Sequence, residues 1–296
     1  MTGSAGAPLR PLGGAGVRPP GAATLRPLGV TEVLDSAVRL ARRNARSVLV
    51  ASAPYAVVAS AATALLQYWT ITSKDAAVIA AMGTLLIPAA FGAVLTGFLA
   101  PLYTSDLLGT PIAIGESARR VGRRTAALLV LGLAILVGEG IGLAACLAGG
   151  VWLWGVWAVA APALVLERQG VRAAFRRSVA LVRGTFWRVW GIRALGWLLT
   201  YVLGQLILLP LSLLALWASG ADPLQTSGDA ANAGVYVAIL AGGQLISSAV
   251  LAPVSAAIDV LLYTDLRMRK EGMDIALRLP ARPAPAGAGQ PAVSAW

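Results

Sequence analysis

The chain of 296 residues contains no histidine, a single cysteine and little charge of either sign. Because histidine is the usual general base near neutral pH and the commonest metal ligand, its absence argues against most hydrolases and metalloenzymes. The lone Cys146 forms neither an intrachain disulfide nor a cysteine-ligated zinc site. Charged residues make up 12% of the chain, against roughly 25% in soluble domains. We therefore expect an integral membrane protein without catalytic residues, metal site or cofactor.

Apolar residues make up 57% of the chain and gather in six stretches, each long enough for a helix across about 30 Å of hydrocarbon. These stretches are 48–70, 77–103, 126–148, 151–166, 190–217 and 234–263. The sequence thus predicts an all-α, polytopic membrane protein with six transmembrane helices in a membrane domain of residues 30–278. The tails, 1–29 and 279–296, lack such stretches and are rich in proline, glycine and alanine, so we expect them to be disordered.

Basic residues decide whether the third and fourth stretches, separated only by Gly149 and Gly150, are two spans or one. With six spans and both termini inside, all basic residues except Lys74 fall on the inner side. Merging the two stretches would place the arginines of 167–193 outside, against the positive-inside tendency. We therefore expect six spans in the cytoplasmic membrane, with both termini cytoplasmic.

A short, basic, amphipathic segment precedes each pair of spans. In the first two, at 100° per residue, charged and apolar side chains fall on opposite faces. Their charged residues are Glu32, Asp35, Arg39, Arg42, Arg43 and Arg46 in the first, and Arg119, Arg120, Arg123 and Arg124 in the second. The second is predicted to begin at Thr110-Pro111, because proline is favoured at the first helical position. The third, 171–189, has the apolar stripe Val171, Phe175, Val182, Phe186 and Val189. This pattern is typical of helices in the membrane interface, with arginines reaching lipid headgroups.

The chain also repeats itself. Residues 35–43 match residues 116–124 at five of nine positions, and residues 102–107 resemble residues 262–266. These repeats predict three units in the same orientation, each an interfacial helix followed by a transmembrane hairpin.

Three ordered segments resemble motifs of one family of membrane proteins. Residues 26–35 are similar to its opening motif, residues 161–167, 174–178 and 181–187 to its central motif, and residues 261–274 to its closing motif. The family is that of the uncharacterised integral membrane proteins labelled glycerophosphoryl diester phosphodiesterase membrane domain, and the resemblance covers residues 26–277. In two-part members, a separate soluble barrel carries the phosphodiesterase chemistry with histidines and acidic metal ligands. The resemblance therefore implies the membrane part alone, and the family assigns no catalytic residues that could be matched to positions of this chain.

Two acidic residues within predicted spans, Glu139 and Asp259, are candidate functional residues because an ionisable group is costly at membrane depth. For Glu139 two interpretations stay open: a proton or cation relay, or a neutral side chain that hydrogen bonds between helices. Asp259, one turn from Tyr263, is more typical of a residue that pairs with an arginine or accepts a hydrogen bond.

Arginines of the third basic segment are candidate ligands for anionic phospholipid headgroups, because a guanidinium group binds a phosphate through two parallel hydrogen bonds. These residues are Arg172, Arg176, Arg177, Arg183 and Arg188. The alternative is that they set the topology and anchor the segment at the interface. Glu167, Asp265 and Glu271, at the inner ends of spans, are candidate ion-pair partners.

The sequence favours a non-enzymatic membrane component that engages lipids or supports the envelope. Two alternatives stay open: a small-solute or ion transporter or channel that uses Glu139, and an assembly scaffold for another membrane protein. Transport predicts a water-accessible path to Glu139, whereas a scaffold predicts a stoichiometric membrane-protein partner. Although the net charge is +11, its placement on the inner side argues against nucleic acid as a partner.

Overall fold

The structure is a computed structural model that describes residues 29–72, 77–110, 112–220 and 230–271. These residues form ten α-helices and no strand, so the all-α prediction is confirmed for them. The helices are α1 (Val30–Arg43), α2 (Ala45–Thr72), α3 (Ala77–Leu107), α4 (Ile114–Gly122), α5 (Thr125–Ala145), α6 (Leu147–Val156), α7 (Ala160–Leu166), α8 (Val171–Val182), α9 (Phe186–Ser219) and α10 (Ala230–Glu271). The predicted disordered tails, apart from Gly29, lie outside the described residues.

Five helical segments among the described residues are long and apolar enough to cross a membrane. They are Ala45–Ile71, Thr125–Ala145, Leu147–Leu166, Phe186–Ser219 and Asn232–Glu271. Helix α3 has 31 residues, about 46 Å at 1.5 Å per residue, but several side chains in its first half lie outside the description. The chain is thus a helical protein with several candidate membrane spans, and the count of six stays a prediction.

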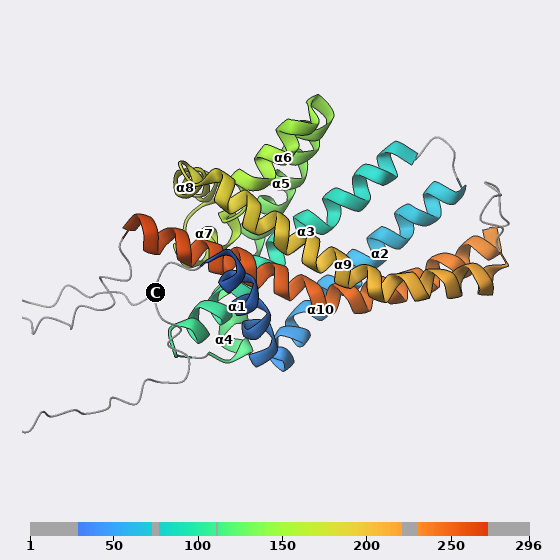
Figure 1. Cartoon of the computed structure of the whole chain (residues 1–296), viewed down its shortest axis with the longest axis horizontal. Helices are drawn as coiled ribbons and strands as arrows, with labels where there is room; N and C mark the ends of the chain where they lie inside the picture. Colours follow the sequence, from blue (N-terminus) through green and yellow to red (C-terminus); the bar gives the residue numbers. More distant parts are fainter. Residues whose placement is uncertain (1–28, 73–76, 111, 221–229, 272–296) are drawn as a thin grey trace, which may run out of the picture.

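The long helices pack on one another, and the short helices α1, α4, α7 and α8 gather toward one end of the molecule (Figure 1). Helix α10 packs along both α9 and α2, α3 packs on α2 and on α5, and α5 pairs with α6. Helices α1, α4 and α8 and the last turns of α10 lie toward the same end, which we call the basic end. In chain order, each of α1, α4 and α8 precedes a pair of long apolar segments.

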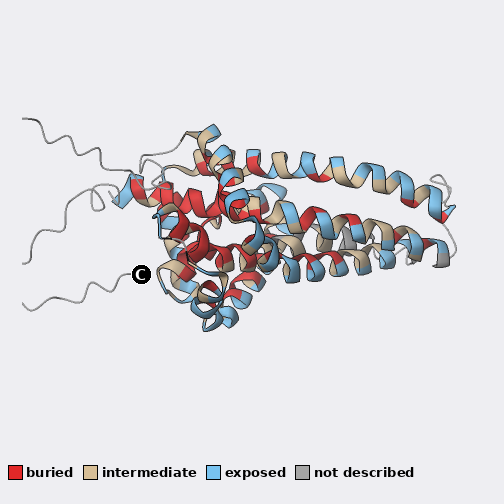
Figure 2. Ribbon diagram, turned by 90° about the horizontal axis from the view of Figure 1, so that it is seen from below, coloured by how far each residue is buried: buried red, intermediate tan, exposed pale blue. Residues whose placement is uncertain are grey.

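Most of the buried side chains lie at the basic end, whereas the opposite ends of the long helices are mostly half-buried or exposed (Figure 2). The largest fully buried side chains include Tyr103 of α3 and Tyr263 of α10, which belong to one cluster with residues of α1, α8 and α9. Exposed leucines and tryptophans cover the long helices, as expected for a surface that faces lipid acyl chains. The packing that fixes the fold is therefore concentrated beside the charged residues described below.

Helix α1 shows why the short helices dock. Val33, Ala37 and Leu40 recur every three or four residues and form one buried face, whereas the arginines of α1 are exposed. Burying a valine or leucine side chain stabilises the protein by about 1.5–3 kcal/mol. The Gly29 amide donates a 2.8 Å hydrogen bond to the Glu32 carboxylate, which satisfies a free N–H at the start of the helix.

The expected helix 171–189 is wrong, because it divides into α8 and the start of α9. Helix α8 ends at Val182, and Gly184 adopts a backbone φ of 84°, a left-handed conformation that glycine accepts without a steric penalty. Phe186 and Val189 therefore belong to α9. The buried face of α8 consists of Ala174, Ser178, Leu181 and Val182, so the predicted stripe is correct for Val182, whereas Val171 and Phe175 are half-buried at its edge.

The second short helix begins later than predicted, at Ile114 after the N-cap residue Ala113. Ser105 at the end of α3 holds the preceding loop: its carbonyl accepts a 2.9 Å hydrogen bond from the Thr110 amide, and its hydroxyl accepts one of 3.4 Å from the Ile112 amide. The chain therefore closes a turn where the sequence predicted a helix start.

The chain turns between α5 and α6 at Cys146, where the backbone is extended, and not at Gly149-Gly150. The two glycines lie in α6 and pack directly on α5. A Cβ atom on Gly142 of α5 would lie 2.9 Å from the backbone nitrogen of Gly150. The glycines therefore allow two antiparallel helices to approach closely, which explains their position better than a loop does.

Candidate functional site

A cluster of three ionisable residues joins α5, α9 and α10 within the candidate spans. Arg193 Nε of α9 lies 3.2 Å from Asp259 Oδ1 of α10, and an Nη1–H of the same guanidinium donates to the Trp154 carbonyl oxygen. The Arg193 guanidinium also lies 4.6 Å from the centroid of the Trp154 ring. Glu139 of α5 is buried, 6% exposed, and lines the same small cavity. The arrangement places one cation among two carboxyl groups and an aromatic face.

The cavity at this cluster has a volume of about 20 Å³. Its polar lining comes from Glu139, Arg193 and Asp259, and its apolar lining includes Trp154 and Trp157. A volume of this size accommodates about one water molecule. The geometry supports hydrogen bonding among three helices, and this cavity by itself does not form an aqueous path to Glu139.

The structure brings the two predicted intramembrane residues together, but the prediction treated Glu139 and Asp259 separately. It also counted Arg193 with the basic residues of the inner loop and missed its role as the cation of the cluster. A signal was present, because Arg193 lies inside the apolar stretch 190–217, where an ionisable side chain needs a partner.

At the basic end, Glu167 connects three helices. Its Oε1 accepts hydrogen bonds of 2.7 Å from Arg177 Nε of α8 and of 2.7 Å from the Tyr263 hydroxyl of α10. Its Oε2 accepts a 2.7 Å bond from the Gln169 amide. Because Glu167 follows α7 directly, these bonds fix α8 against α7 and α10.

Arg177 has a second carboxylate partner, Glu271, which also pairs with Arg267 Nε at 2.9 Å. Burial alone would lower the pKa of the Arg177 guanidinium. The hydrogen bonds that Arg177 donates to Glu167 and Glu271 outweigh burial, so its pKa is raised above its ordinary value. The Arg177 guanidinium therefore remains charged and is paired with carboxylates of the protein itself.

Two further aspartates, Asp106 and Asp265, occupy corresponding positions in the similar segments 102–107 and 262–266, and each pairs with arginine. Asp265 of α10, whose side chain is 1% exposed, lies 3.3 Å from Arg188 and 2.9 Å from Arg269. Asp106 of α3 lies 3.4 Å from Arg43, at the end of α1. The ion pairs expected for Glu167, Asp265 and Glu271 are thus present, and they rigidify the basic end.

Lys270 adds a bond between α10 and the C-terminus of α8. Its Nζ donates to the carbonyl oxygens of Ala180 at 2.8 Å and of Arg183 at 2.6 Å. A cation at this position satisfies carbonyls that have no partner within the helix and interacts favourably with the helix dipole.

The five predicted lipid ligands fall into two groups. Arg177 and Arg188 are partly buried and paired with carboxylates. Arg172, Arg176 and Arg183 are exposed, and no side-chain ion pair forms to them within the described part of the chain. The structure therefore separates arginines that join helices of the basic end, Arg177 and Arg188, from arginines that remain available at the surface.

The described residues contain no group of three or more cysteine, aspartate or glutamate side chains placed to hold a metal ion. Comparisons with protein-family models, with curated proteins and with solved structures found no match. The resemblance of residues 26–277 to the membrane-domain family therefore stays a prediction.

Proposed function

We propose that the protein is a non-enzymatic component of the cytoplasmic membrane that engages anionic lipid headgroups through the exposed arginines of α8 and its C-terminal turn, Arg172, Arg176 and Arg183. In this proposal the chain crosses the membrane six times, both termini are cytoplasmic, and α1, α4 and α8 lie in the inner interface. The resemblance of residues 26–277 to the glycerophosphoryl diester phosphodiesterase membrane domain agrees with a membrane component of this kind.

The observation that carries the proposal is the division among the arginines of α8 and its C-terminal turn. Arg177 is held by Glu167 and Glu271, so α8 has a fixed position on α7 and α10. Arg172, Arg176 and Arg183 are exposed and have no carboxylate partner in the described ranges. A rigid helix that presents free guanidinium groups is well suited to bind phosphate groups through paired hydrogen bonds.

The length of α10 supports a place for this end at the membrane surface. Its 42 residues span about 63 Å at 1.5 Å per residue, twice the hydrocarbon thickness of about 30 Å. The last turns of α10, with Arg267, Arg269 and Lys270, therefore extend toward the headgroups or tilt into them. Basic residues near an anionic surface contribute about 1 kcal/mol each to attraction.

The charge cluster around Glu139 has a structural part in this proposal. A cavity of about 20 Å³ suits one bridging water, and Arg193 supplies the charge partner that Asp259 needs. We propose that the cluster fixes α5 and α9 against α10.

The test is the lipid composition retained by the purified full-length protein, measured by mass spectrometry. The variant Arg172→Gln/Arg176→Gln/Arg183→Gln removes the exposed arginines. A matched control, Arg39→Gln/Arg119→Gln/Arg120→Gln, removes three arginines that pair with carboxylates within their own helices.

We expect the wild type and the control to retain anionic lipid above its bulk fraction, and the first variant to retain a bulk-like mixture. Equal retention by both variants would contradict headgroup binding by these arginines and leave them a topological role.

A further inference from the structure

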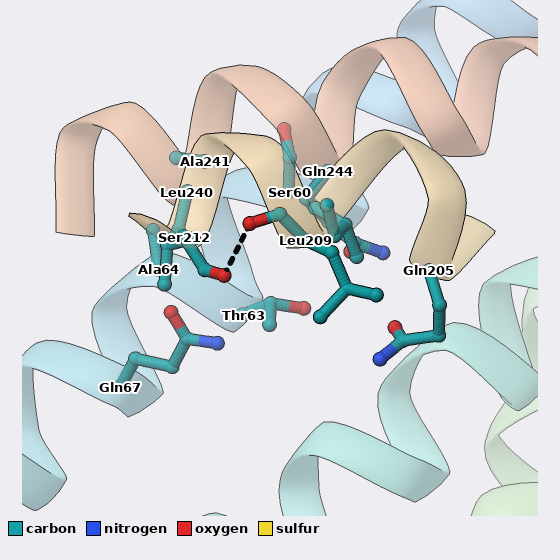
Figure 3. A pocket seen from close by; sticks show the side chains of 11 residues that line it. Ser60, Thr63, Ala64, Gln67, Gln205, Leu209, Ser212, Leu240, Ala241 and Gln244 are labelled. Atoms are coloured by element: carbon teal, nitrogen blue, oxygen red, sulfur yellow. Dashed lines mark hydrogen bonds between the residues drawn. The ribbon is translucent and has the colours of Figure 1, made fainter. Parts of the chain in front are cut away.

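A second polar site lies between α2, α9 and α10, inside the candidate spans and away from the charge cluster. It is a groove of about 190 Å³ into which three glutamines from three helices project: Gln67, Gln205 and Gln244 (Figure 3). Counting 1.5 Å per residue, Ser60 and Gln67 lie about 18 and 8 Å from the end of α2, and Gln205 about 21 Å from the end of α9. The groove is therefore at membrane depth in the half of the bundle opposite the basic end.

The glutamine amides have no hydrogen-bond partner among the described residues, although all three side chains are half-buried. An amide in hydrocarbon is costly unless it is hydrogen bonded. Three such groups from three different helices facing one groove are therefore best explained by a ligand that bonds to them.

The remaining polar lining consists of hydroxyl groups whose protons are already used. Ser60, Thr63 and Ser212 donate to carbonyl oxygens of their own helices at 3.1, 2.8 and 2.7 Å. Their oxygens remain free as acceptors, and the three amides offer both donors and acceptors. No lining residue is charged. The site thus suits an uncharged group that both donates and accepts hydrogen bonds, as hydroxyl groups do.

Close packing of α9 on α10 gives the groove a defined shape. A Cβ atom on Gly204 would lie 3.2 Å from Ser247 Oγ, and one on Gly243 would lie 2.6 Å from Leu211 Cδ1. Small residues, Ala64 and Ala241, leave space at the centre, and Leu209, 54% exposed, lines the edge. With about 190 Å³, below the roughly 300–1,000 Å³ of pockets for drug-sized ligands, the groove is headgroup-sized rather than the size of a whole drug-like ligand.

We propose that this groove binds an uncharged, hydroxyl-rich group of about the size of one sugar ring, either as the headgroup of a neutral lipid or as a free polyol. The site is independent of the exposed arginines of α8, because no charged residue lines it.

The test uses the full-length protein in nanodiscs of phosphatidylcholine with a minor fraction of a monohexosyl diacylglycerol, and lipid retained after purification is measured by mass spectrometry. A second arm adds methyl hexoside as a free competitor. The variant Gln67→Leu/Gln205→Leu/Gln244→Leu removes the amides, and Ala241→Phe fills the groove without touching them. Thr200→Val on α9 is the control, because it removes a hydroxyl that bonds within its own helix outside the groove.

We expect the wild type and Thr200→Val to enrich the hexosyl lipid, or to bind methyl hexoside, and both groove variants to lose the binding by about tenfold or more. Displacement of the lipid by methyl hexoside assigns the recognition to the sugar itself, and lipid enrichment without displacement assigns it to the lipid-linked form. Bulk-like retention together with no methyl hexoside binding in the wild type would overturn the proposal. Unchanged binding in both groove variants would overturn it as well.

Because Leu replaces unpaired amides at membrane depth, the triple variant is expected to be at least as stable as the wild type. Should it not fold, Ala241→Phe tests the groove on its own, since it blocks the space and keeps the three amides. Loss of anionic-lipid retention in the Arg172, Arg176 and Arg183 variant, with hexoside binding unchanged, would separate this site from the proposed headgroup surface.

Discussion

The ion pair between Arg193 and Asp259 gives the sharpest quantitative prediction, because it is buried and has one dominant partner on each side. Their Nε–Oδ1 distance is 3.2 Å, and their side chains are 21% and 12% exposed. Removing one partner of a buried pair costs about 3–5 kcal/mol, since the other charge is left without compensation. Residual exposure reduces this cost for both variants, and Glu139 remains beside Arg193 when Asp259 is replaced, so we expect about 3 kcal/mol for Arg193→Gln and about 2 kcal/mol for Asp259→Asn.

A double-mutant cycle isolates the interaction itself. Residues in one network couple by about 0.5–3 kcal/mol. We therefore expect the double variant Arg193→Gln/Asp259→Asn to lose about 2 kcal/mol less free energy of unfolding than the sum of the two single variants. The unfolding free energy is measured by detergent titration in mixed micelles, followed through the fluorescence of the nine tryptophans.

The control is the pair Arg39 and Asp35 on α1, whose side chains are 65% and 70% exposed. Exposed pairs within a helix contribute about 0.3–0.5 kcal/mol, so its coupling energy should be several times smaller. Equal coupling in the two cycles, or additive losses for Arg193 and Asp259, would refute the inference that the cluster joins α9 to α10.

Three further predictions concern the helix contacts, the topology and a surface carboxyl group. Gly142→Ala should lower the free energy of unfolding by about 1–3 kcal/mol, because its Cβ would meet the backbone of α6, whereas Gly92→Ala, with nothing within 4 Å, should be neutral or stabilising in the same titration. Cys146, exposed at the turn after α5, should react with a membrane-impermeant thiol reagent in intact cells, and reaction only after lysis would contradict the six-span topology. The Glu116 carboxyl should titrate below its ordinary pKa of about 4.5, because the Arg120 guanidinium donates a hydrogen bond to it. The contribution of Glu116 to the stability of α4 is therefore present above that value and is lost as the pH falls through the lowered pKa. A carbon NMR titration of the Glu116 carboxyl group measures this pKa. Arg120→Gln should raise the midpoint of the Glu116 titration, and an unchanged midpoint would refute the pairing.

The approximate extents of the long helices could be predicted from the sequence because uninterrupted apolar stretches of about 20 residues report directly on membrane-sized helices. The predicted stretch 126–148 corresponds to α5, and 190–217 lies within α9. The end of α8 could not be predicted in the same way. Residues 171–189 keep an amphipathic pattern across the break at Gly184, and a pattern of side chains does not record a single left-handed residue.

The candidate sites show the same limit for contacts between distant residues. Glu139 and Asp259 stand out in the sequence because they are acidic residues in apolar surroundings. That both lie beside Arg193 depends on how α5, α9 and α10 are rotated toward one another, and the sequence does not specify this rotation. The three glutamines of the groove likewise come from three separate stretches of the chain. Among the arginines of residues 172–188, the sequence offered five equivalent candidates, and only the packing of α8 on α7 and α10 separates Arg177 from Arg176, its neighbour in the chain.

The central claim, that Arg172, Arg176 and Arg183 contact lipid phosphates, is tested most directly by the distance between arginine Cζ atoms and lipid phosphorus. Solid-state NMR measures this distance through ¹³C–³¹P dipolar coupling in vesicles that contain anionic lipid, with the full-length protein labelled at arginine Cζ. We predict coupling from direct contacts that is reduced in Arg172→Gln/Arg176→Gln/Arg183→Gln and retained in Arg39→Gln/Arg119→Gln/Arg120→Gln. The same coupling in both variants would contradict the claim.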